Sequence, residues 1–131
     1  MGDHEVRVVG LDHIVLNCAD VERSLAWYCD ELGLAGERVE EWRRGDAPFP
    51  SVRIDARTII DLFPAERSGT NMDHVCLVVV PTDLAALATS GRFDVLGDGP
   101  ADGLFGAQGL ATSLYVRDPD GNTVELRSYA T

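Results

Sequence analysis

The sequence lacks any apolar run that approaches the ~20 residues an α-helix needs to cross a bilayer. The first ten residues, Met1–Gly10, also lack the apolar stretch of a secretory signal. These two absences predict a cytoplasmic protein without a membrane partner.

Basic residues are scarce, since 11 Lys and Arg stand against 22 Asp and Glu, and the formal net charge is −11. Nucleic acids and anionic membrane surfaces are bound through basic patches. The charge balance therefore argues against nucleic acid and anionic membrane as partners.

Cysteine is also scarce. Cys18, Cys29 and Cys76 are odd in number, have no CxxC spacing, and each lies among apolar residues. No neighbouring residue is of a kind that would lower the pKa of a thiol and make it reactive. We interpret all three as reduced, small core residues, as expected in a cytoplasmic protein.

The chain is long enough for one domain with a buried core. It has 131 residues, of which 45% are hydrophobic and 25% charged, an ordinary composition for a globular protein. We expect a single domain over residues 1–131.

The first half of the chain predicts one strand, one helix and three further strands. Asp20 is a good N-cap, apolar residues follow at helical spacing from Val21 to Leu32, and Gly33 supplies a stop. The expected strands are 11–18, 38–42, 51–55 and 57–63, with a loop at 43–50. The pattern is βαβββ.

The pattern restarts after a polar connector at 64–72. A strand at 72–79 is followed by a short helix capped by Thr82, a short strand at 93–96, and a glycine-rich stretch at 97–109 that we interpret as a flexible loop. A hairpin over 113–128 ends the unit, and Asp118-Pro-Asp-Gly-Asn122 forms its turn. Module one therefore covers about residues 10–63 and module two about residues 72–129.

The polar anomalies repeat with the modules. His13 aligns with His74 and Asp61 with Glu125, at a period near 61–64 residues. Glu125 lies between Val124 and Leu126, and a carboxylate inside a barrel must be paired, protonated or bound to metal. In a pseudo-twofold arrangement these four side chains would converge on one divalent metal ion.

A plainer interpretation exists for each residue alone, because a single strand histidine is usually a hydrogen-bonded core residue. The coincidence of two repeated pairs favours the metal site. His4 lies outside the repeat and is interpreted as structurally idle. Several arginines and aromatic residues could contact a substrate, although solvated surface positions explain them as well: Trp42, Arg43, Arg44, Phe49, Arg53 and Arg57.

The order DHIVLNCADVERSLAWYCDELGL, IIDLF, MDHVCL and SLYVRDPDGNTVEL resembles the vicinal oxygen chelate superfamily. That superfamily includes glyoxalase I, extradiol dioxygenases, methylmalonyl-CoA epimerase, fosfomycin thiol transferases and bleomycin-binding proteins. The resemblance covers about residues 10–129, and its terminal motif separates the members poorly.

The resemblance implies an α+β fold in which two βαβββ modules form an open eight-stranded mixed β-barrel around a divalent metal (Zn, Ni, Co, Mn or Fe). His13, His74 and Glu125 match metal-ligand positions. Asp61 falls where glyoxalase I has a glutamate ligand and is one methylene shorter. In short members of the family, modules from different chains often build each site, which implies a homodimer.

Three functions remain open. A metal-dependent, glyoxalase-like lyase or isomerase would act on a small α-oxygenated carbonyl substrate, with Glu125 or Asp61 as catalytic base. If Asp61 does not bind metal, His13, His74 and Glu125 form the two-histidine, one-carboxylate set of an Fe(II) extradiol-type dioxygenase. A non-catalytic antibiotic-binding protein is the third, although the drug-binding members lack these ligands.

Overall fold

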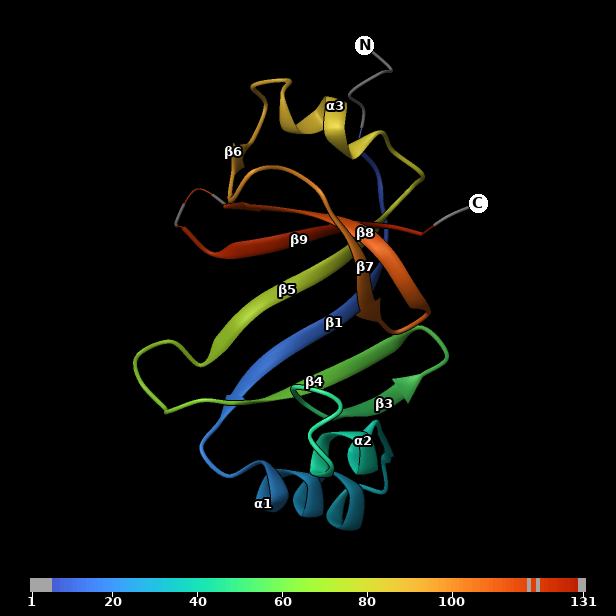
Figure 1. Cartoon of the computed structure of the whole chain (residues 1–131), viewed down its shortest axis with the longest axis vertical. Coiled ribbons are helices and arrows are strands. Elements are labelled where there is room, and N and C mark those ends of the chain that lie inside the picture. The colour runs from blue at the N-terminus through green and yellow to red at the C-terminus, as the bar shows by residue number, and fades with distance from the viewer. Residues whose placement is uncertain (1–5, 118, 120, 130–131) are drawn as a thin grey trace. The chain divides into compact units, whose positions relative to one another are not determined.

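The computed structural model describes residues 6–117, 119 and 121–129 (Figure 1). The chain divides into two compact units, unit 1 with Met1–Asp12 and His74–Thr131, and unit 2 with His13–Asp73. His4, Asp118 and Asp120, for which the sequence predicts an idle tail and a turn, lie outside the described residues.

Unit 2 contains a mixed four-stranded sheet in the order β2-β3-β4-β1. Its strands are β1 (Val8–Cys18, from His13 onward in this unit), β2 (Ala35–Glu37), β3 (Ser51–Asp55) and β4 (Thr58–Pro64). β3 pairs antiparallel with β2 and β4, whereas β1 and β4 are parallel. The strands at 11–18, 51–55 and 57–63 that the sequence predicts are therefore confirmed.

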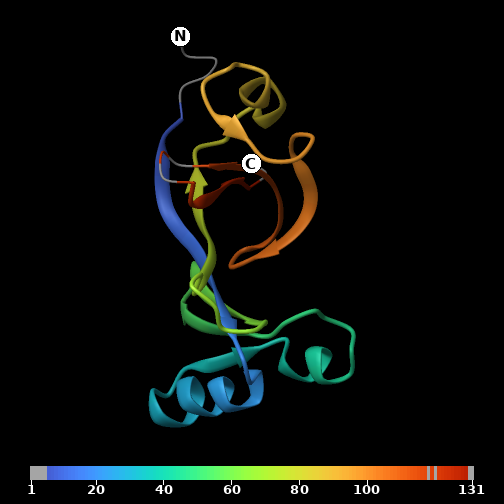
Figure 2. The same cartoon turned by 90° about the vertical axis from the view of Figure 1, so that its left-hand side faces the viewer.

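The predicted first helix is also confirmed. α1 (Val21–Ala26) begins at Asp20, whose side chain accepts a hydrogen bond from the Arg23 amide, and it continues as the π-helix η2 (Trp27–Glu31). Gly33 follows with a φ of 75°, the left-handed conformation that ends helices. The helices lie along one side of the unit 2 strands (Figures 1 and 2).

The strand predicted at 38–42 is wrong. A short helix, α2 (Val39–Arg43), occupies this segment, and only β2 before it is extended. Arg38 adopts a φ of 57° and turns the chain out of the extended conformation. Val39 and Trp42, three residues apart, then pack together on the unit 2 core, as the faces of a helix require. That core is formed by Cys18, Val21, Leu25, Val52 and Leu62.

Unit 1 contains the strand order β5-β9-β8-β6, with β7 also paired to β8. Its elements are β5 (Met72–Val79, from His74 onward in this unit), α3 (Leu84–Ala88), β6 (Asp94–Val95), β7 (Ala101–Gly106), β8 (Gly109–Arg117) and β9 (Thr123–Ser128). β5 and β9 are parallel, and β8 is antiparallel to β9. The predicted strands at 72–79 and 93–96 and the terminal hairpin are confirmed.

The flexible loop predicted at 97–109 is wrong, because β7 lies within it and pairs antiparallel with β8. β6 pairs with the end of β8, at Val116 and Arg117, and β7 pairs with its beginning. Together they form one interrupted strand, so unit 1 keeps the βαβββ plan. Glycine obscured the strand in the sequence: Gly103, with a φ of 68°, lies where the β7–β8 register shifts.

The helix cap predicted at Thr82 is wrong by one residue. Asp83 is the N-cap of α3, and its side chain accepts a hydrogen bond from the Ala86 amide at 3.0 Å. Thr82 instead donates its hydroxyl to the Val80 carbonyl. α3 covers the sheet of unit 1 with Leu84 and Leu87 (Figure 1). The other buried members of that core are Val79, Leu114, Val116 and Leu126.

The fold class predicted from the sequence is confirmed: the chain has an α+β fold with mixed sheets, built from βαβββ modules with few, short helices. No helix among the described residues is both long and apolar enough to cross a membrane. Cys18 and Cys76 are buried and Cys29 is half-buried against the unit 2 core, which confirms their prediction as packing residues.

Candidate metal-binding residues

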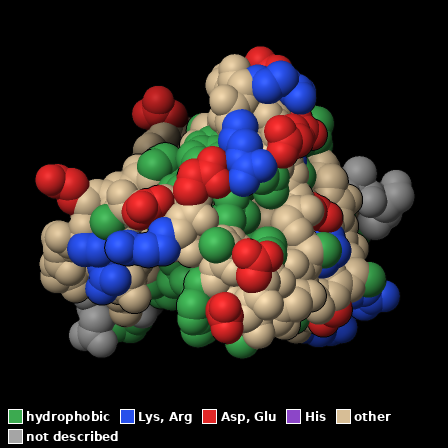
Figure 3. All heavy atoms as spheres, turned by 90° about the horizontal axis from the view of Figure 1, so that it is seen from below, with side chains coloured by type: hydrophobic (Ala, Val, Ile, Leu, Met, Phe, Trp, Pro, Cys, Tyr) green, Lys and Arg blue, Asp and Glu red, His purple; other side chains and the backbone are tan. Residues whose placement is uncertain are grey.

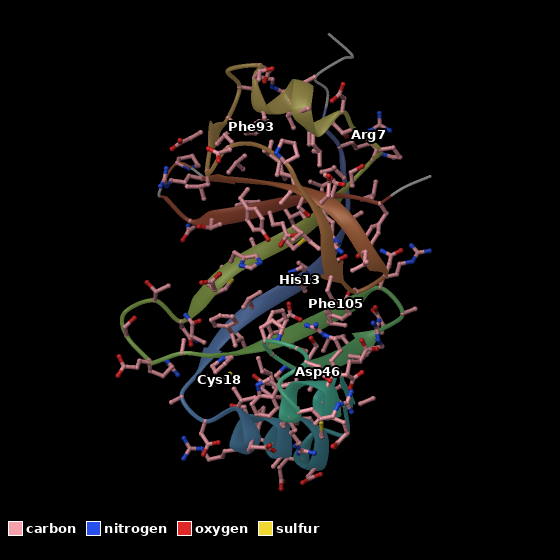
Figure 4. All side chains as sticks on the ribbon, in the orientation of Figure 1. Arg7, His13, Cys18, Asp46, Phe93 and Phe105 are labelled. Atoms are coloured by element: carbon pink, nitrogen blue, oxygen red, sulfur yellow. The ribbon has the colours of Figure 1, made fainter. Side chains whose placement is uncertain are left out.

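In unit 2 the fold brings together the histidine and the carboxylate that module one contributes. His13 on β1 and Asp61 on β4 come from neighbouring parallel strands, in which Val15 is the register partner of Asp61. Figure 4 labels His13 on β1. The distance from His13 Nε2 to Asp61 Oδ2 is 3.7 Å, and both side chains are buried. The Asp61 carboxylate thus directs one oxygen toward the imidazole.

The other Asp61 oxygen is bound by a serine. Ser51 is the register partner of Asp61 across β3 and β4, and its hydroxyl donates to Asp61 Oδ1 at 2.5 Å. Ser51 is fully buried. Unit 2 therefore holds a His–Asp–Ser group in which the serine fixes the orientation of the carboxylate.

In unit 1 the histidine and the carboxylate that module two contributes meet in the same way. His74 on β5 and Glu125 on β9 lie on parallel strands, and the distance from His74 Nε2 to Glu125 Oε1 is 3.0 Å. Ser113 on β8 donates to the other carboxylate oxygen, Glu125 Oε2, at 2.7 Å. Glu125 and Ser113 are buried, so unit 1 repeats the His–carboxylate–Ser group of unit 2.

The donor atoms of both groups fit a divalent transition metal. With bonds of about 2.0–2.2 Å, two ligands of a tetrahedral ion lie about 3.4 Å apart. The His–carboxylate distances of 3.7 Å in unit 2 and 3.0 Å in unit 1 lie on either side of that value. Imidazole with carboxylate suits Zn, Ni, Co, Mn and Fe, and carboxylate ligands are typically held by a further hydrogen bond, as the serines do here.

The two groups differ in what else surrounds the carboxylate. In unit 1, Arg127 Nη1 donates to Glu125 Oε2 at 3.3 Å. Tyr115 is the register partner of Glu125 and packs its ring edge-on to the His74 ring. Burial, and then the Glu125 charge, raise the pKa of Tyr115, so the phenol is neutral at physiological pH.

Cys76 lies beside Glu125 in the β5–β9 register. Burial raises the pKa of its thiol well above the ordinary value, and the charges of Glu125 and Asp12 raise it further. The thiol therefore stays protonated, which agrees with its prediction as a packing residue rather than a nucleophile.

Near Asp61, Arg38 lies with its guanidinium 4.8 Å from the centre of the Phe49 ring. Burial lowers the pKa of Arg38, and the negative charge of Asp61 is the largest influence in the opposite direction. Sequence reasoning did not single out Arg38, whose strained backbone only the structure reveals.

Three of the four arginines that the sequence offered as substrate contacts, all but Arg57, have ion pairs within unit 2. Arg43 binds Glu22 and Glu40, Arg44 binds Asp46, and Arg53 binds Glu37. Acidic and basic side chains lie next to one another on the outer face seen in Figure 3, where α1 lies. Trp42 packs on the unit 2 core. These contacts account for Arg43, Arg44 and Trp42 without a substrate.

Residues 10–126 match the family described as the Glyoxalase/Bleomycin resistance protein/Dioxygenase superfamily. The chain belongs to this superfamily. Its relatives include the virulence protein STM3117 of Salmonella typhimurium, 25% identical over 91% of this chain and 83% of that protein. The glyoxalase domain-containing protein RDO1 of Mycosarcoma maydis is 28% identical over 95% of this chain and 71% of its own length.

Solved structures of the superfamily share the fold. The methylmalonyl-CoA epimerase of Mycobacterium tuberculosis superposes with a TM-score of 0.64, at 19% identity, over 95% of this chain and 90% of that one. A Streptomyces coelicolor methylmalonyl-CoA epimerase variant in complex with 2-nitronate-propionyl-CoA gives 0.62, at 19% identity, over 95% and 99%. At these identities the likeness establishes the fold, and the residues must carry the argument about function.

Proposed function

We propose that this superfamily member is a metal-dependent lyase or isomerase of the glyoxalase type, which acts on a small α-oxygenated carbonyl compound. The observation that carries the proposal is the repetition of one group in both units, a histidine beside a carboxylate whose second oxygen is bound by a serine. A packing role alone gives no reason for the same buried polar group to occur twice.

In this proposal His13 and Asp61 supply one half of a metal site, and His74 and Glu125 supply the other half. Two imidazoles and two carboxylates leave open positions on a divalent ion for two substrate oxygens. When bound, such an ion polarises neighbouring substrate oxygens and makes the adjacent C–H bond more acidic.

The carboxylates carry the proton in this reaction. Asp61 or Glu125 would accept the proton from the activated carbon and return it to the same carbon in an epimerisation, or to the neighbouring carbon in an isomerisation. Electrons and atoms balance without an oxidant, because one C–H bond breaks and another forms. Because the Asp61 side chain is one methylene shorter than that of Glu125, the position of its carboxylate relative to the substrate carbon is the more critical one. A 1 Å misplacement can cost about 10²-fold in rate.

The experiment is to load the protein with Ni, Zn, Co, Mn or Fe(II) in turn and follow exchange of a substrate α-hydrogen with deuterated water. A hemithioacetal and an epimerisable acyl thioester are the probes. Metal-dependent exchange, absent from Glu125→Gln and retained by the exposed control Glu66→Gln, supports the proposal. Oxygen uptake on catechols with Fe(II) alone would replace it with the dioxygenase, and tight ligand binding without exchange would replace it with the antibiotic-binding function.

We also propose that the protein acts as a homodimer. Exposed apolar side chains lie on strands of both units, such as Val9 on β1, Leu110 on β8 and Ile54 on β3. Exposed apolar surface of this kind is commonly covered by a partner.

Mixing two variants tests how the dimer builds its sites. In His13→Ala alone or His74→Ala alone, every metal site lacks one histidine. A dimer of one chain of each variant regains one intact site if the two histidines of a site come from different chains. Recovered exchange after mixing indicates sites shared between chains, and no recovery indicates sites within one chain. Light scattering that gives a monomer at micromolar concentration would contradict the dimer itself.

A further inference from the structure

Arg127 is the largest fully buried side chain in the described part of the protein. Its Nη2 donates to the Leu104 carbonyl at 2.6 Å and to the Gly109 carbonyl at 2.7 Å, both in the β7–β8 hairpin. Its Nη1 donates to Glu125 Oε2 at 3.3 Å. One guanidinium thus connects the hairpin with the proposed metal-binding carboxylate.

A second layer of contacts fixes Arg127. Its Nε lies 3.5 Å from Asp12 Oδ2, and Asp12 also accepts the Ala107 amide at 2.9 Å. Tyr129 donates its hydroxyl to Asp12, and the guanidinium lies 4.8 Å from the centre of the Tyr129 ring. The Gln108 amide donates to the Tyr129 hydroxyl at 3.0 Å. The hairpin turn, Asp12 and Tyr129 therefore form one network around Arg127.

Gly106 makes room for this arrangement. A Cβ atom at position 106 would lie 2.4 Å from Arg127 Cζ and 2.5 Å from Nε and Nη2. Glycine is consequently the residue that lets the β7 backbone approach the guanidinium this closely.

The Arg127 guanidinium faces two buried carboxylates, Asp12 and Glu125. Asp12 is fully buried and supplies one negative charge beside the guanidinium. The shortest Arg127 contacts go to neutral carbonyls, while the contact with Glu125 is the longest of its hydrogen bonds. Arg127 therefore holds one Glu125 oxygen through its longest hydrogen bond, while Asp12 provides a second carboxylate beside the guanidinium. A buried arginine is costly unless its donors are used. Here Nη1 and Nη2 donate hydrogen bonds, while Nε lies 3.5 Å from Asp12 Oδ2 without a hydrogen bond.

We propose that Arg127 is a positioning residue for the metal site. With Ser113 it holds Glu125 Oε2, so that Oε1 alone faces His74 and Glu125 binds metal through one oxygen. The β7–β8 hairpin is thereby coupled to the metal ligand through Arg127. The inference rests on the proposed metal site and adds a residue that the His–carboxylate repeat does not contain, since position 63, which aligns with Arg127, is Phe63.

The test compares Co(II) binding by the full chain and by three variants. Arg127→Met removes the guanidinium, and Arg127→Lys keeps the positive charge but lacks the planar set of N–H donors. Gly106→Ala keeps Arg127 but displaces its guanidinium, because the added Cβ occupies its place. Arg117→Lys is the control, because Arg117 is exposed and pairs with Asp94 at 3.5 Å. Affinity is measured by competition with a chelator, coordination by the visible spectrum of bound Co(II), and folding by circular dichroism of the metal-free proteins.

We expect folded Arg127→Met and Gly106→Ala to bind Co(II) about 10–100-fold more weakly and to change its spectrum, as loss of a residue behind a ligand does. Arg127→Lys should recover part of the affinity, and the control should match wild type. Should Arg127→Met not fold, Gly106→Ala and Arg127→Lys decide the matter. Wild-type affinity and spectrum in the folded variants would overturn the inference alone. If wild type itself binds no Co(II), the proposed metal site fails first, and the inference with it.

Discussion

Ser51 stands directly opposite Asp61 in the β3–β4 register and donates its hydroxyl to Asp61 at 2.5 Å. The equivalent contact in the other unit joins Ser113 to Glu125 at 2.7 Å. Both hydroxyls are buried and both bind the carboxylate oxygen that faces away from the histidine. Each serine fixes one carboxylate oxygen and thereby orients the other oxygen toward the histidine.

Removing either hydroxyl should therefore weaken metal binding without removing a ligand. Ser51→Ala and Ser113→Ala are each expected to lower the affinity for Zn or Co about 10–100-fold, because the carboxylate loses the group that orients it. Chelator competition measures the effect, and Ser68→Ala, at an exposed position, is the control. Unchanged affinity in both buried variants would show that the serines serve packing alone.

The candidate site could be proposed from the sequence because its residues repeat. His13 with His74 and Asp61 with Glu125 align in sequence, and the structure places each histidine beside its carboxylate within its own unit. A serine also binds the carboxylate in each unit, but Ser51 is the register partner of Asp61 whereas Ser113 is the register partner of Arg127. Alignment of the repeats would therefore not have paired the two serines. A serine in a strand is common, so the role of these two becomes clear only once the strand register and their burial are known.

The errors have local physical causes. The strand predicted at 38–42 was wrong because Arg38 turns the chain there. A non-glycine residue with a positive φ cannot be recognised from the hydrophobic pattern of the sequence. The loop predicted at 97–109 followed from its glycines, whereas Gly106 serves the approach of Arg127 to β7. Arg127 lies on the same strand face as Glu125, but its burial depends on Asp12 and on the hairpin turn, which are distant in sequence.

The backbone of Arg38 gives a second prediction. A side chain in the left-handed conformation costs about 1–2 kcal/mol, and glycine avoids that cost. Arg38→Gly and Arg38→Ala both lose the contact with Phe49, so their difference isolates the backbone. We expect the glycine variant to have the larger free energy of unfolding, by about 1 kcal/mol, in urea denaturation.

The control for this pair is Glu40, an exposed residue within α2. There the glycine variant should be the less stable one, by about 0.5–1 kcal/mol relative to alanine, because glycine has the lower helix propensity. If glycine and alanine rank in the same order at both positions, the left-handed conformation of Arg38 is wrong.

Tyr129 gives a prediction about alkaline pH. Burial, and then its hydrogen bond to Asp12, raise the pKa of Tyr129 to about 12, above the ordinary value of 10.0. A raised pKa means that the folded state retains the phenolic proton more strongly than the unfolded chain does. The resulting stability is fully present below about pH 10 and is lost as the pH rises through about 12.

Unfolding of wild type and Tyr129→Phe in urea, at steps of pH from about 9 to about 12, measures this contribution. Tyr129→Phe should have the smaller free energy of unfolding at pH 9. The difference from wild type should decrease toward pH 12, because wild type then loses the stability that the Tyr129 proton provides and the variant lacks that stability at every pH. A gap that stays constant over the whole range would refute the assignment of a protonated Tyr129 to the Arg127 network.

The most direct test of the central claim is the metal content of the purified protein and its single-ligand variants, measured by elemental analysis after loading with Zn or Co and removal of free ions. Wild type should retain about one ion per chain, as expected for one site per two His–carboxylate pairs. His13→Ala, His74→Ala and Glu125→Gln should each lose most of it, while Glu66→Gln should match wild type. Retention of a full complement of metal by His74→Ala would contradict the claim that the two repeated groups form a metal site.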